Sequence, residues 1–349
     1  MKAEFTTKLM EWNRSGNKRA LPWKGEKDPY RIWLSEVILQ QTRVEQGWQY
    51  YERFIKAFPT VQDLACSSEE KLFKLWEGLG YYSRCKNLHA SAKIISERFN
   101  GIFPSSYKEI LSLKGVGPYT AAAIASFAFN LPHAVVDGNV ERVLSRYFGI
   151  NTPVDSRDGK QLYAELANSL LEKDDPAAYN QAIMDFGATI CKPRNPLCID
   201  CIQKEDCQAF QHDWINDLPV KEKSLVRKSR WFTYYIVQYN NKLYIRKRMN
   251  KDIWANLFEF ILNESSNESE QSFAIKPETI RAVLGIDQFV VQSVSPYFKQ
   301  ELTHQTIRGQ FVTISIKKPL DKKEFILVAR EELTHFAFPK LINTFLQQS

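Results

Sequence analysis

Apolar residues recur at intervals of three and four positions through the first 210 residues, a periodicity that predicts a succession of amphipathic helices. In residues 30–43 this spacing puts Glu36 on the same helical face as Trp33 and Leu39. No alternating strand pattern occurs in this half of the chain, so we predict an all-α domain over residues 1–210. Its other periodic stretches are residues 47–58, 68–78, 84–99 and 106–113.

The pattern changes after residue 210. Residues 211–230 are polar and charge-rich, which is typical of a linker. Beyond them, runs of β-branched and aromatic residues predict strands, so we expect a separate α+β domain over residues 231–349. Within it, residues 263–272 (NESSNESEQS) are predicted as a surface loop and residues 341–349 as a short helix. The predicted strands are residues 231–239, 242–249, 258–262, 289–298, 311–318 and 324–330.

Composition limits the classes of protein to which this chain can belong. At 349 residues, with 44% hydrophobic and 25% charged, it has the content of two globular domains rather than of a disordered or fibrous protein. The longest apolar run, Ala121–Phe129 with Ser126 inside it, is far too short to cross a bilayer, and the N-terminus lacks the apolar core of a signal peptide. We therefore expect a cytoplasmic protein that does not act at a membrane. The net charge of +7 permits a polyanionic ligand without requiring one.

Four of the six cysteines lie within one short window and follow the pattern C-x6-C-x2-C-x5-C. In a chain without secretion signals, such clustering favours metal binding over disulfides. Four thiolates at these spacings hold either zinc or an iron–sulfur cluster, and the spacing alone leaves both open. The clustered cysteines are Cys191, Cys198, Cys201 and Cys207, and the isolated ones are Cys66 and Cys85.

A glycine hairpin stands between two predicted helices, in the sequence LKGVGPYT. Gly115 and Gly117 leave backbone N–H groups accessible beside the start of the next helix, which is an arrangement that binds anions. G-x-G alone is more typical of a plain helix connection with no ligand. The longer pattern, followed by an alanine-rich helix, is the helix–hairpin–helix pattern of DNA repair proteins. Such a hairpin binds phosphates and positions DNA without reading its sequence.

Two carboxylates stand in surroundings that suit acid–base chemistry. Glu36 lies on an apolar helical face, where desolvation is expected to raise its pKa toward neutrality. Asp137 follows the apolar run HAVV and precedes a helical pattern, D-G-N-V-x-R-V-L. An aspartate at that place also serves as an ordinary helix cap, and a glutamate on an apolar face is often structural.

Taken together with their flanking residues, these features resemble the adenine-specific DNA glycosylases, the MutY family. The resemblance covers nearly all of residues 5–210. It implies an all-α helix–hairpin–helix glycosylase domain with an iron–sulfur cluster loop. The motifs that carry it are LPW (21–23), DPYRIWLSEVILQQTRV (28–44), FPTVQDLA (58–65), WEGLGYYSRCKNLH (76–89), GVGPYTAAAI (115–124), VDGNVERVL (136–144) and NQAIMDFGATIC (180–191).

The resemblance implies an enzyme that excises adenine mispaired with 8-oxoguanine or guanine from double-stranded DNA, acting as a monomer. Approximately residues 30–130 would form a six-helix part, and residues 1–29 and 131–210 an iron–sulfur part holding a 4Fe–4S cluster on the four clustered cysteines. In bacteria such an enzyme would be nucleoid-associated. The implied site residues are Glu36 as general acid, Asp137 as stabiliser of the sugar cation, Tyr119 and Asn139 as supports, Asp185 and Trp23 in the adenine pocket, and Gln41 and Tyr81 as wedges beside 8-oxoguanine.

Position 119 distinguishes this family from the related endonuclease III enzymes, which have a lysine there that attacks the sugar and breaks the strand. Because Tyr119 cannot form a Schiff base, we predict a monofunctional glycosylase. A bifunctional thymine-glycol or mismatch glycosylase is an alternative, but this sequence does not have the lysine that such an enzyme needs at position 119. A non-catalytic DNA-binding or electron-carrying iron–sulfur protein is another, and its function would not depend on Glu36.

The second domain resembles the family's Nudix-like recognition domain, although the match is weaker. The sequence LTHQTIRG places Thr303 and His304 where the family reads 8-oxoguanine with serine and histidine, while Leu302 replaces a phenylalanine. The catalytic box of nucleotide-hydrolysing Nudix proteins is missing from the sequence, so nucleotide hydrolysis is not expected. Two departures in the first domain, Lys114 for a hairpin proline and Lys24 for a residue that is often arginine, are expected to tune DNA contacts.

Overall fold

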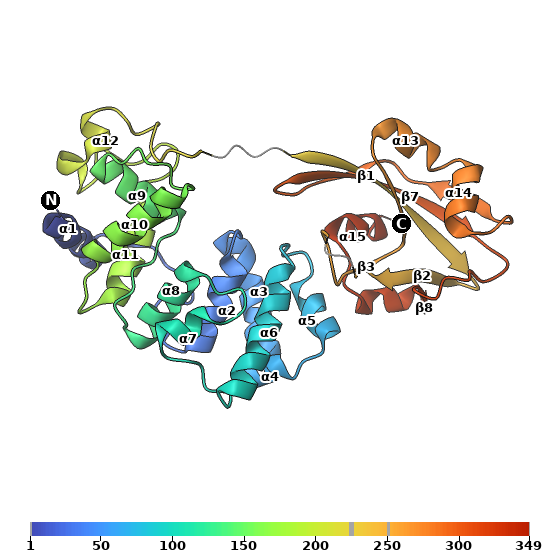
Figure 1. Ribbon diagram of the computed structural model, residues 1–349, viewed down its shortest axis with the longest axis horizontal. Coiled ribbons are helices and arrows are strands. Elements are labelled where there is room, and N and C mark those ends of the chain that lie inside the picture. The colour runs from blue at the N-terminus through green and yellow to red at the C-terminus, as the bar shows by residue number, and fades with distance from the viewer. Residues whose placement is uncertain (1, 223–226, 250–251, 349) are drawn as a thin grey trace. The chain divides into compact units, whose positions relative to one another are not determined.

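The computed structural model describes residues 2–222, 227–249 and 252–348 (Figure 1). The chain divides into two compact units. Met1–Cys66 and Lys86–Ser224 form the first unit, and Ser67–Cys85 and Leu225–Ser349 form the second. The predicted helix at residues 68–78, expected in the helical domain, therefore lies in the second unit.

Among its described residues the first unit contains helices and no strand, as the periodicity predicts. Local signals begin and end these helices. Asp28 accepts the Tyr30 N–H to start α2, Pro118 follows Gly117 at the start of α8, and Asn130 ends α8 in the left-handed conformation. The helices are α1 (Lys2–Ser15), α2 (Pro29–Leu39), α3 (Val44–Ala57), α4 (Val61–Ala65), α6 (Ser83–Arg98, shared between the units), α7 (Tyr107–Leu111), α8 (Pro118–Phe129), α9 (Gly138–Phe148), α10 (Arg157–Leu170), α11 (Pro176–Thr189) and α12 (Gln208–Gln211), with a 3₁₀ turn at Lys204–Asp206.

The second unit is built on a mixed sheet whose two central strands, β1 and β7, run parallel and side by side (Figure 1). The sheet order is β3-β2-β1-β7-β5, with β4 paired to β1, β6 to β7 and β8 to β2. Its strands are β1 (Lys228–Tyr239), β2 (Lys242–Lys247), β3 (Phe258–Glu259), β4 (Ile261–Ser265), β5 (Val290–Val294), β6 (Phe298–Glu301), β7 (Gln305–Ser315) and β8 (Ile326–Ala329), and its helices are α5 (Glu69–Trp76), α13 (Glu268–Phe273), α14 (Pro277–Leu284) and α15 (Lys340–Leu346).

Strand alternation gives this sheet two apolar faces. On one face Val312 of β7 packs in a cluster with Ile280 of α14. On the other face Phe311, the preceding residue, stacks on Phe345 of α15 at 4.1 Å between ring centroids. Because neighbouring side chains of a strand point to opposite faces, a helix covers each side of the sheet.

The prediction for residues 263–272 is wrong. Their first residues complete β4, and Glu268–Phe273 forms α13. Asn267 begins this helix by accepting the Glu270 N–H at 2.9 Å, an N-cap interaction that a polar, serine-rich sequence conceals. The linker prediction also extends too far, since β1 already begins at Lys228.

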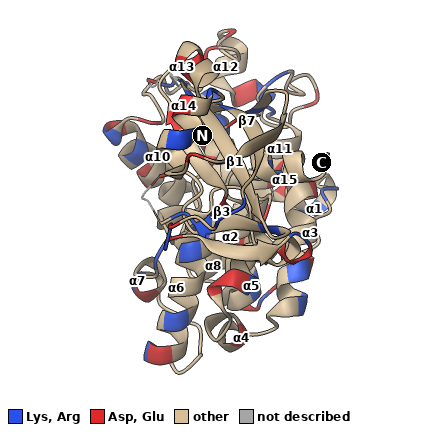
Figure 2. Ribbon diagram, turned by 90° about the vertical axis from the view of Figure 1, so that its right-hand side faces the viewer, with Lys and Arg blue, Asp and Glu red and all other residues tan. Residues whose placement is uncertain are grey.

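Charges in the second unit are arranged in cross-element pairs. The first turn of α5 carries Glu69 and Glu70 (red in Figure 2), and Lys247 of β2 pairs with both, at 3.2 and 3.5 Å. Within the sheet, Arg248 is buried and bonds to Glu259 at 2.7 Å. None of the helices formed by residues 2–222, 227–249 and 252–348 has the length and apolar character needed to cross a membrane.

Candidate active site

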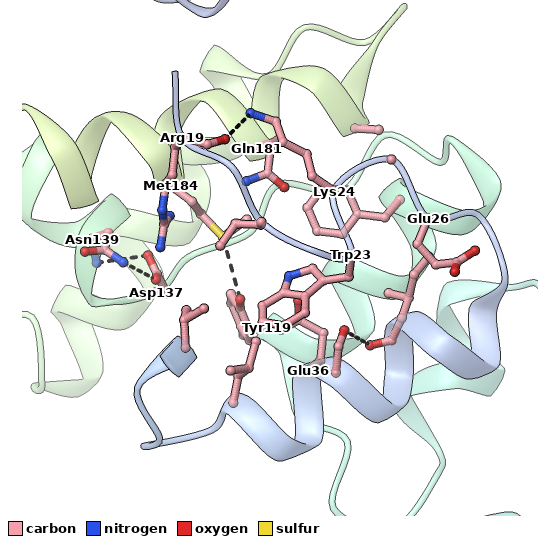
Figure 3. A pocket seen from close by; sticks show the side chains of 18 of the residues that line it. Arg19, Trp23, Lys24, Glu26, Glu36, Tyr119, Asp137, Asn139, Gln181 and Met184 are labelled. Carbon is pink, nitrogen blue, oxygen red and sulfur yellow. Dashed lines mark hydrogen bonds between the residues drawn. The ribbon is translucent and has the colours of Figure 1, made fainter. Parts of the chain in front are cut away.

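A cavity of about 740 Å³ opens in the first unit, and both candidate carboxylates line it (Figure 3). Glu36 reaches it from α2 and Tyr119 from α8. Asp137 and Asn139 reach it from the start of α9. Gln41 and Trp23 also line the cavity, together with Arg19, Lys24, Gln181 and Met184.

Glu36 is partly buried at the cavity wall, and this environment changes its acidity. Desolvation raises the pKa of its carboxyl to about 7. The hydrogen bond with Tyr119 opposes the rise, and the negative charge of Asp137 adds to it. A substantial fraction of Glu36 therefore carries a proton at neutral pH, as the apolar helical face predicts.

Tyr119 lies between the two carboxylates in the view of Figure 3 and interacts with both. Burial raises the pKa of its phenol well above the usual value, so the hydroxyl stays protonated. It lies 3.6 Å from the Met184 Sδ and shares a hydrogen bond with Glu36. A neutral hydroxyl at this place orients the acid without competing for its proton.

Asp137 is the N-cap of α9, the structural role that its sequence position suggests. Its Oδ1 accepts the backbone N–H groups of Asn139 and Val140, each at 2.9 Å, and its Oδ2 accepts Asn139 Nδ2 at 2.8 Å. The same carboxylate lines the cavity. Capping and facing the cavity are therefore compatible, because the three N–H donors and the helix N-terminus hold the negative charge in one orientation.

Arg142, one turn into α9, connects this cap to the cysteine loop and was not singled out from the sequence. Its Nη2 donates to Asn139 Oδ1 at 2.9 Å and to the Gly187 carbonyl at 2.7 Å, and its Nε donates to the Cys191 carbonyl at 2.7 Å. Helical periodicity gives no signal for Arg142, because it is two positions from both Val140 and Leu144 and therefore lies nearly opposite them on α9. A buried arginine needs several acceptors, and here they are all backbone or amide oxygens.

Asp185 does not line the cavity, contrary to the prediction of an adenine-pocket residue. It is fully buried behind the wall and organises four side chains through its carboxylate. Three of them, Arg19, Lys24 and Gln181, face the cavity. The bonds are from Arg19 Nη1 at 2.8 Å, Lys24 Nζ at 3.1 Å, Gln181 Nε2 at 2.9 Å and Asn17 Nδ2 at 2.8 Å.

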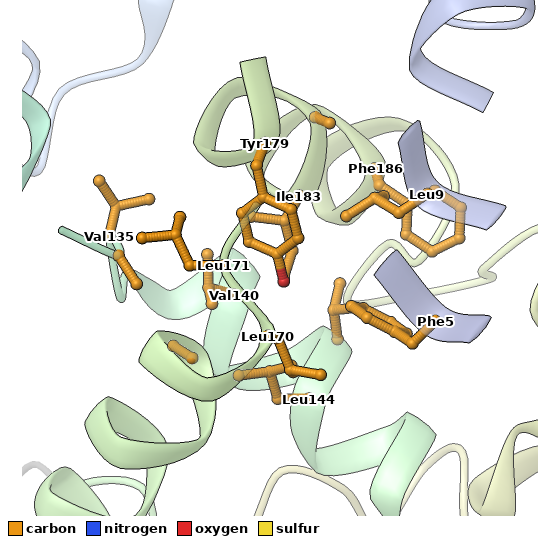
Figure 4. Packing of buried hydrophobic residues seen from close by; sticks show 14 of the residues in the cluster. Phe5, Leu9, Val135, Val140, Leu144, Leu170, Leu171, Tyr179, Ile183 and Phe186 are labelled. Atoms are coloured by element: carbon orange, nitrogen blue, oxygen red, sulfur yellow. The ribbon is translucent and has the colours of Figure 1, made fainter. Parts of the chain in front are cut away.

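The helices that carry Asp137 and Gln181 are fixed by a hydrophobic core to which α1 contributes (Figure 4). Phe5 of α1 packs on Tyr147 of α9 at 4.7 Å, and Trp12 meets Phe186 of α11 edge-on at 5.1 Å between ring centroids. Burying each such ring contributes about 2 kcal/mol or more. The helix-typical spacing of Phe5, Leu9 and Trp12 is a signal in the sequence that could have predicted α1.

The hairpin has the geometry its glycines predict. Gly115 adopts φ +76°, and a Cβ there would lie 2.7 Å from Asn87. A Cβ at Gly117 would have no neighbouring atom within 4 Å, so the backbone there is open to a ligand. Lys114, the departure from the family's proline, has its carbonyl held by the Ser91 hydroxyl at 2.9 Å.

The four clustered cysteines line one small cavity of about 30 Å³. The buried Arg146 lies beside it, with Nη1 3.5 Å from the Cys191 Sγ and 2.8 Å from the Lys192 carbonyl. Four sulfur donors around one space, with a cation next to one of them, fit an anionic thiolate-bound group. Although the four cysteines line one cavity, neither they nor any other three His, Cys, Asp or Glu side chains among the described residues are close enough to hold a single metal ion.

In the second unit, Tyr81 and Thr303 lie together. Their hydroxyls are hydrogen-bonded, and Tyr81 is 43% exposed. His304 is exposed, and its backbone carbonyl accepts the Lys228 N–H at 3.0 Å. The structure thus places these predicted recognition residues on one surface of the second unit.

Comparisons with known proteins identify the class. Residues 34–169 match the HhH-GPD superfamily of base excision DNA repair proteins, and residues 233–348 match the NUDIX domain. A thermostable thymine-DNA glycosylase has a similar structure, with a TM-score of 0.56 at 30% identity over 60% of this chain and 97% of its own. An endonuclease III in a non-covalent DNA complex shows the same fold, with a TM-score of 0.53 at 21% identity over 61% of this chain and 98% of its own.

Similarity to individual proteins narrows the class to one family. The adenine DNA glycosylase of Buchnera aphidicola (subspecies Baizongia pistaciae) is 39% identical over 258 residues, which cover 73% of each chain. The human adenine DNA glycosylase is 41% identical over 216 residues, which cover 59% of this chain and 39% of the human protein. The chain belongs to the adenine DNA glycosylase family and is a DNA glycosylase of base excision repair. The resemblance inferred from the motifs and the expected combination of helix–hairpin–helix and Nudix folds are confirmed.

Proposed function

We propose that this protein hydrolyses the N-glycosidic bond of adenine mispaired with 8-oxoguanine or guanine in double-stranded DNA, and that it does so as a monofunctional glycosylase. The observation that carries the proposal is the single cavity onto which Glu36 and Asp137 converge from different helices. An adenine inside a duplex cannot reach this cavity, so the nucleotide must be flipped out of the stack.

The two carboxylates would divide the work according to their environments. Glu36, with a pKa of about 7, would donate its proton to the N7 of the flipped adenine and make the base a better leaving group. Asp137, held by three N–H donors, would stabilise the positive charge that develops on the deoxyribose. Tyr119 would orient Glu36, and Asn139 would hold Asp137.

The wall of the cavity suits a purine. Trp23 offers an apolar face, and Gln181 an amide whose Nε2 is already donated to Asp185. Position 119 and the comparisons weigh against the bifunctional thymine-glycol or mismatch glycosylase. Tyr119 supplies no amine for strand cleavage, and the thymine-DNA glycosylase covers only 60% of this chain, whereas the Buchnera adenine enzyme covers 73%.

A 4Fe–4S cluster would be held by Cys191, Cys198, Cys201 and Cys207. When bound it would supply a rigid, charged anchor for the loop between the first two cysteines rather than acid–base chemistry. Arg146 beside the Cys191 sulfur fits the negative charge of such a group. Broad visible absorbance together with iron in the purified protein supports this assignment, whereas a colourless protein that contains zinc contradicts it.

DNA binding would combine the hairpin with the second unit. Gly115 and Gly117 would hold the phosphate backbone, while Gln41 and Tyr81 would wedge into the helix beside the orphan base. Thr303 and His304 would recognise 8-oxoguanine opposite the excised adenine. We expect a monomer to be sufficient for these contacts.

The test is an excision assay on a duplex with one A:8-oxoguanine pair, analysed with and without alkali. Wild type is expected to give strand breaks only after alkali, because a monofunctional enzyme leaves an intact abasic site. Glu36→Gln and Asp137→Asn should lose adenine release, and Glu97→Gln, an exposed change on α6, should keep it. Strand breaks without alkali, or full activity of both active-site variants, would overturn the proposal.

A further inference from the structure

The segment before Tyr81, residues 74–77, is attached to the rest of the second unit by polar contacts of Lys74 and Glu77. Lys74 Nζ donates to the Phe336 carbonyl at 3.0 Å and to Glu77 Oε2 at 2.7 Å. Glu77 Oε1 accepts the Phe338 N–H at 2.7 Å. Lys74 Nζ and Glu77 Oε1 therefore join the end of α5 to the chain segment that precedes α15, and Glu77 Oε2 pairs with Lys74 between them. Glu77 is largely buried, so these charge-assisted bonds are shielded from solvent.

The turn between Glu77 and Tyr81 is held by two side chains. The Gly80 carbonyl accepts Trp76 Nε1 at 3.0 Å and Arg84 Nη2 at 3.2 Å. Tyr81 itself adopts φ +47°, a left-handed conformation that is unfavourable for a tyrosine and persists only where its surroundings enforce it. The Tyr81 side chain lies at the surface of the second unit.

The hydroxyl of this ring bonds to the hydroxyl of Thr303, 222 positions later in the chain. Thr303 occupies the short connection between β6 and β7, which is closed by a bond from the Leu302 N–H to the Gln305 carbonyl at 2.7 Å. Two loops that lie far apart along the chain therefore meet through one pair of hydroxyls.

We propose that Glu77 and the Tyr81 hydroxyl are positioning groups that fix the Thr303 hydroxyl for reading the base opposite the excised adenine. The inference rests on the proposed function and deepens it, because it adds Glu77 and the Tyr81 hydroxyl to the residues, Thr303 and His304, to which 8-oxoguanine recognition is assigned. The Tyr81 ring would contact DNA, while its hydroxyl acts through Thr303.

The chemistry explains why the orientation of one hydroxyl matters. 8-Oxoguanine differs from guanine at N7, which becomes a donor, and at C8, which gains a carbonyl acceptor. A threonine hydroxyl offers one hydrogen and two lone pairs, and it rotates freely unless a partner fixes it. Once Tyr81 occupies one of these positions, the remaining ones point in set directions. Removing that partner leaves Thr303 in place but free to satisfy either base.

The experiment measures the preference for 8-oxoguanine over guanine in the full-length protein. Single-turnover adenine release and half-saturating protein concentration are determined on A:8-oxoguanine and A:guanine duplexes, and anisotropy gives binding of the same duplexes without excision. Tyr81→Phe keeps the ring and removes only the hydroxyl. We expect it to lower the preference about fivefold, mainly through weaker binding of the 8-oxoguanine duplex. The release rate at saturating protein should stay within about twofold.

Three further variants make the result specific. Thr303→Val should lose the same preference, and the Tyr81→Phe/Thr303→Val double variant no more than either single variant, because the two hydroxyls act as a pair. Glu77→Gln retains an acceptor for the Phe338 N–H but loses the ion pair with Lys74, and it should reduce the preference less than Tyr81→Phe does. Glu324→Gln, an exposed change in the same unit, should leave the preference unchanged.

An unchanged preference in Tyr81→Phe overturns the inference, as does an equal loss of binding to both duplexes, which would make the hydroxyl a general DNA contact. Additive effects in the double variant also contradict it. Absence of adenine release by wild type would instead reject the proposed function. The anisotropy ratios would then still decide the inference, because they do not depend on excision.

Discussion

Replacing Glu36 by glutamine is expected to abolish adenine release and, at the same time, to stabilise the protein at alkaline pH. Glutamine has nearly the same volume and keeps a hydrogen-bond partner for Tyr119, but it cannot ionise. The folded protein must either keep Glu36 protonated or bear a negative charge in a poorly solvated wall beside Asp137. Glutamine, which stays neutral at every pH, avoids both the bound proton and the buried charge.

The magnitude follows from the acidity of the group. Desolvation raises the pKa of Glu36 from 4.5 to about 7, so the folded state binds the proton more tightly than the unfolded state. The free energy of unfolding therefore falls as pH rises between these values and is lowest above them. At 1.36 kcal/mol per pH unit the full difference is about 3 kcal/mol at pH 8. Because Glu36 is only partly buried beside an open cavity, we expect about 2 kcal/mol.

Urea unfolding of wild type and Glu36→Gln at pH 5 and pH 8 measures this effect. The difference between the two proteins is taken at each pH, so that groups common to both cancel. We expect the variant to gain about 2 kcal/mol more at pH 8 than at pH 5, and Glu97→Gln to show no such change. An equal difference at both pH values would refute the reasoning that burial keeps Glu36 protonated. In wild type, single-turnover adenine release should fall as pH rises through about 7, because Glu36 loses the proton that it would donate.

Three other predictions test the surroundings of the site. Asp185→Asn removes the buried charge that holds Arg19 and Lys24, and adenine release at saturating DNA should fall by about tenfold or more; Asp158→Asn, an exposed change on α10, is the control, and equal rates in the two variants would contradict the role. Tyr119→Lys places an amine at the cavity, so borohydride should trap a covalent DNA adduct that wild type does not form. Cys198→Ser should reduce visible absorbance and weaken DNA binding, and unchanged absorbance would exclude Cys198 as a ligand.

Many helices and site residues of the first unit could be predicted because the sequence signals for them are local. Periodicity predicts α2, and the Gly-Pro sequence before Tyr119 predicts the start of α8. The position of Asp137 before a helical pattern predicts its cap. Each of these signals involves neighbours within one or two helical turns, so it can be read without knowing the fold. Where a polar sequence conceals the signal, as at residues 263–272, the prediction is wrong.

What the sequence by itself determined is the order and type of most elements, the residue types of the candidate site and the family. What only the tertiary structure decided is which distant side chains meet. Glu36 and Asp137 converge on one cavity because α2 and α9 are held by packing against other helices, and Asp185 lies behind that cavity because its buried carboxylate needs the cations of Arg19 and Lys24. A buried polar group must find partners wherever the fold brings them, and no local pattern in the chain records that choice.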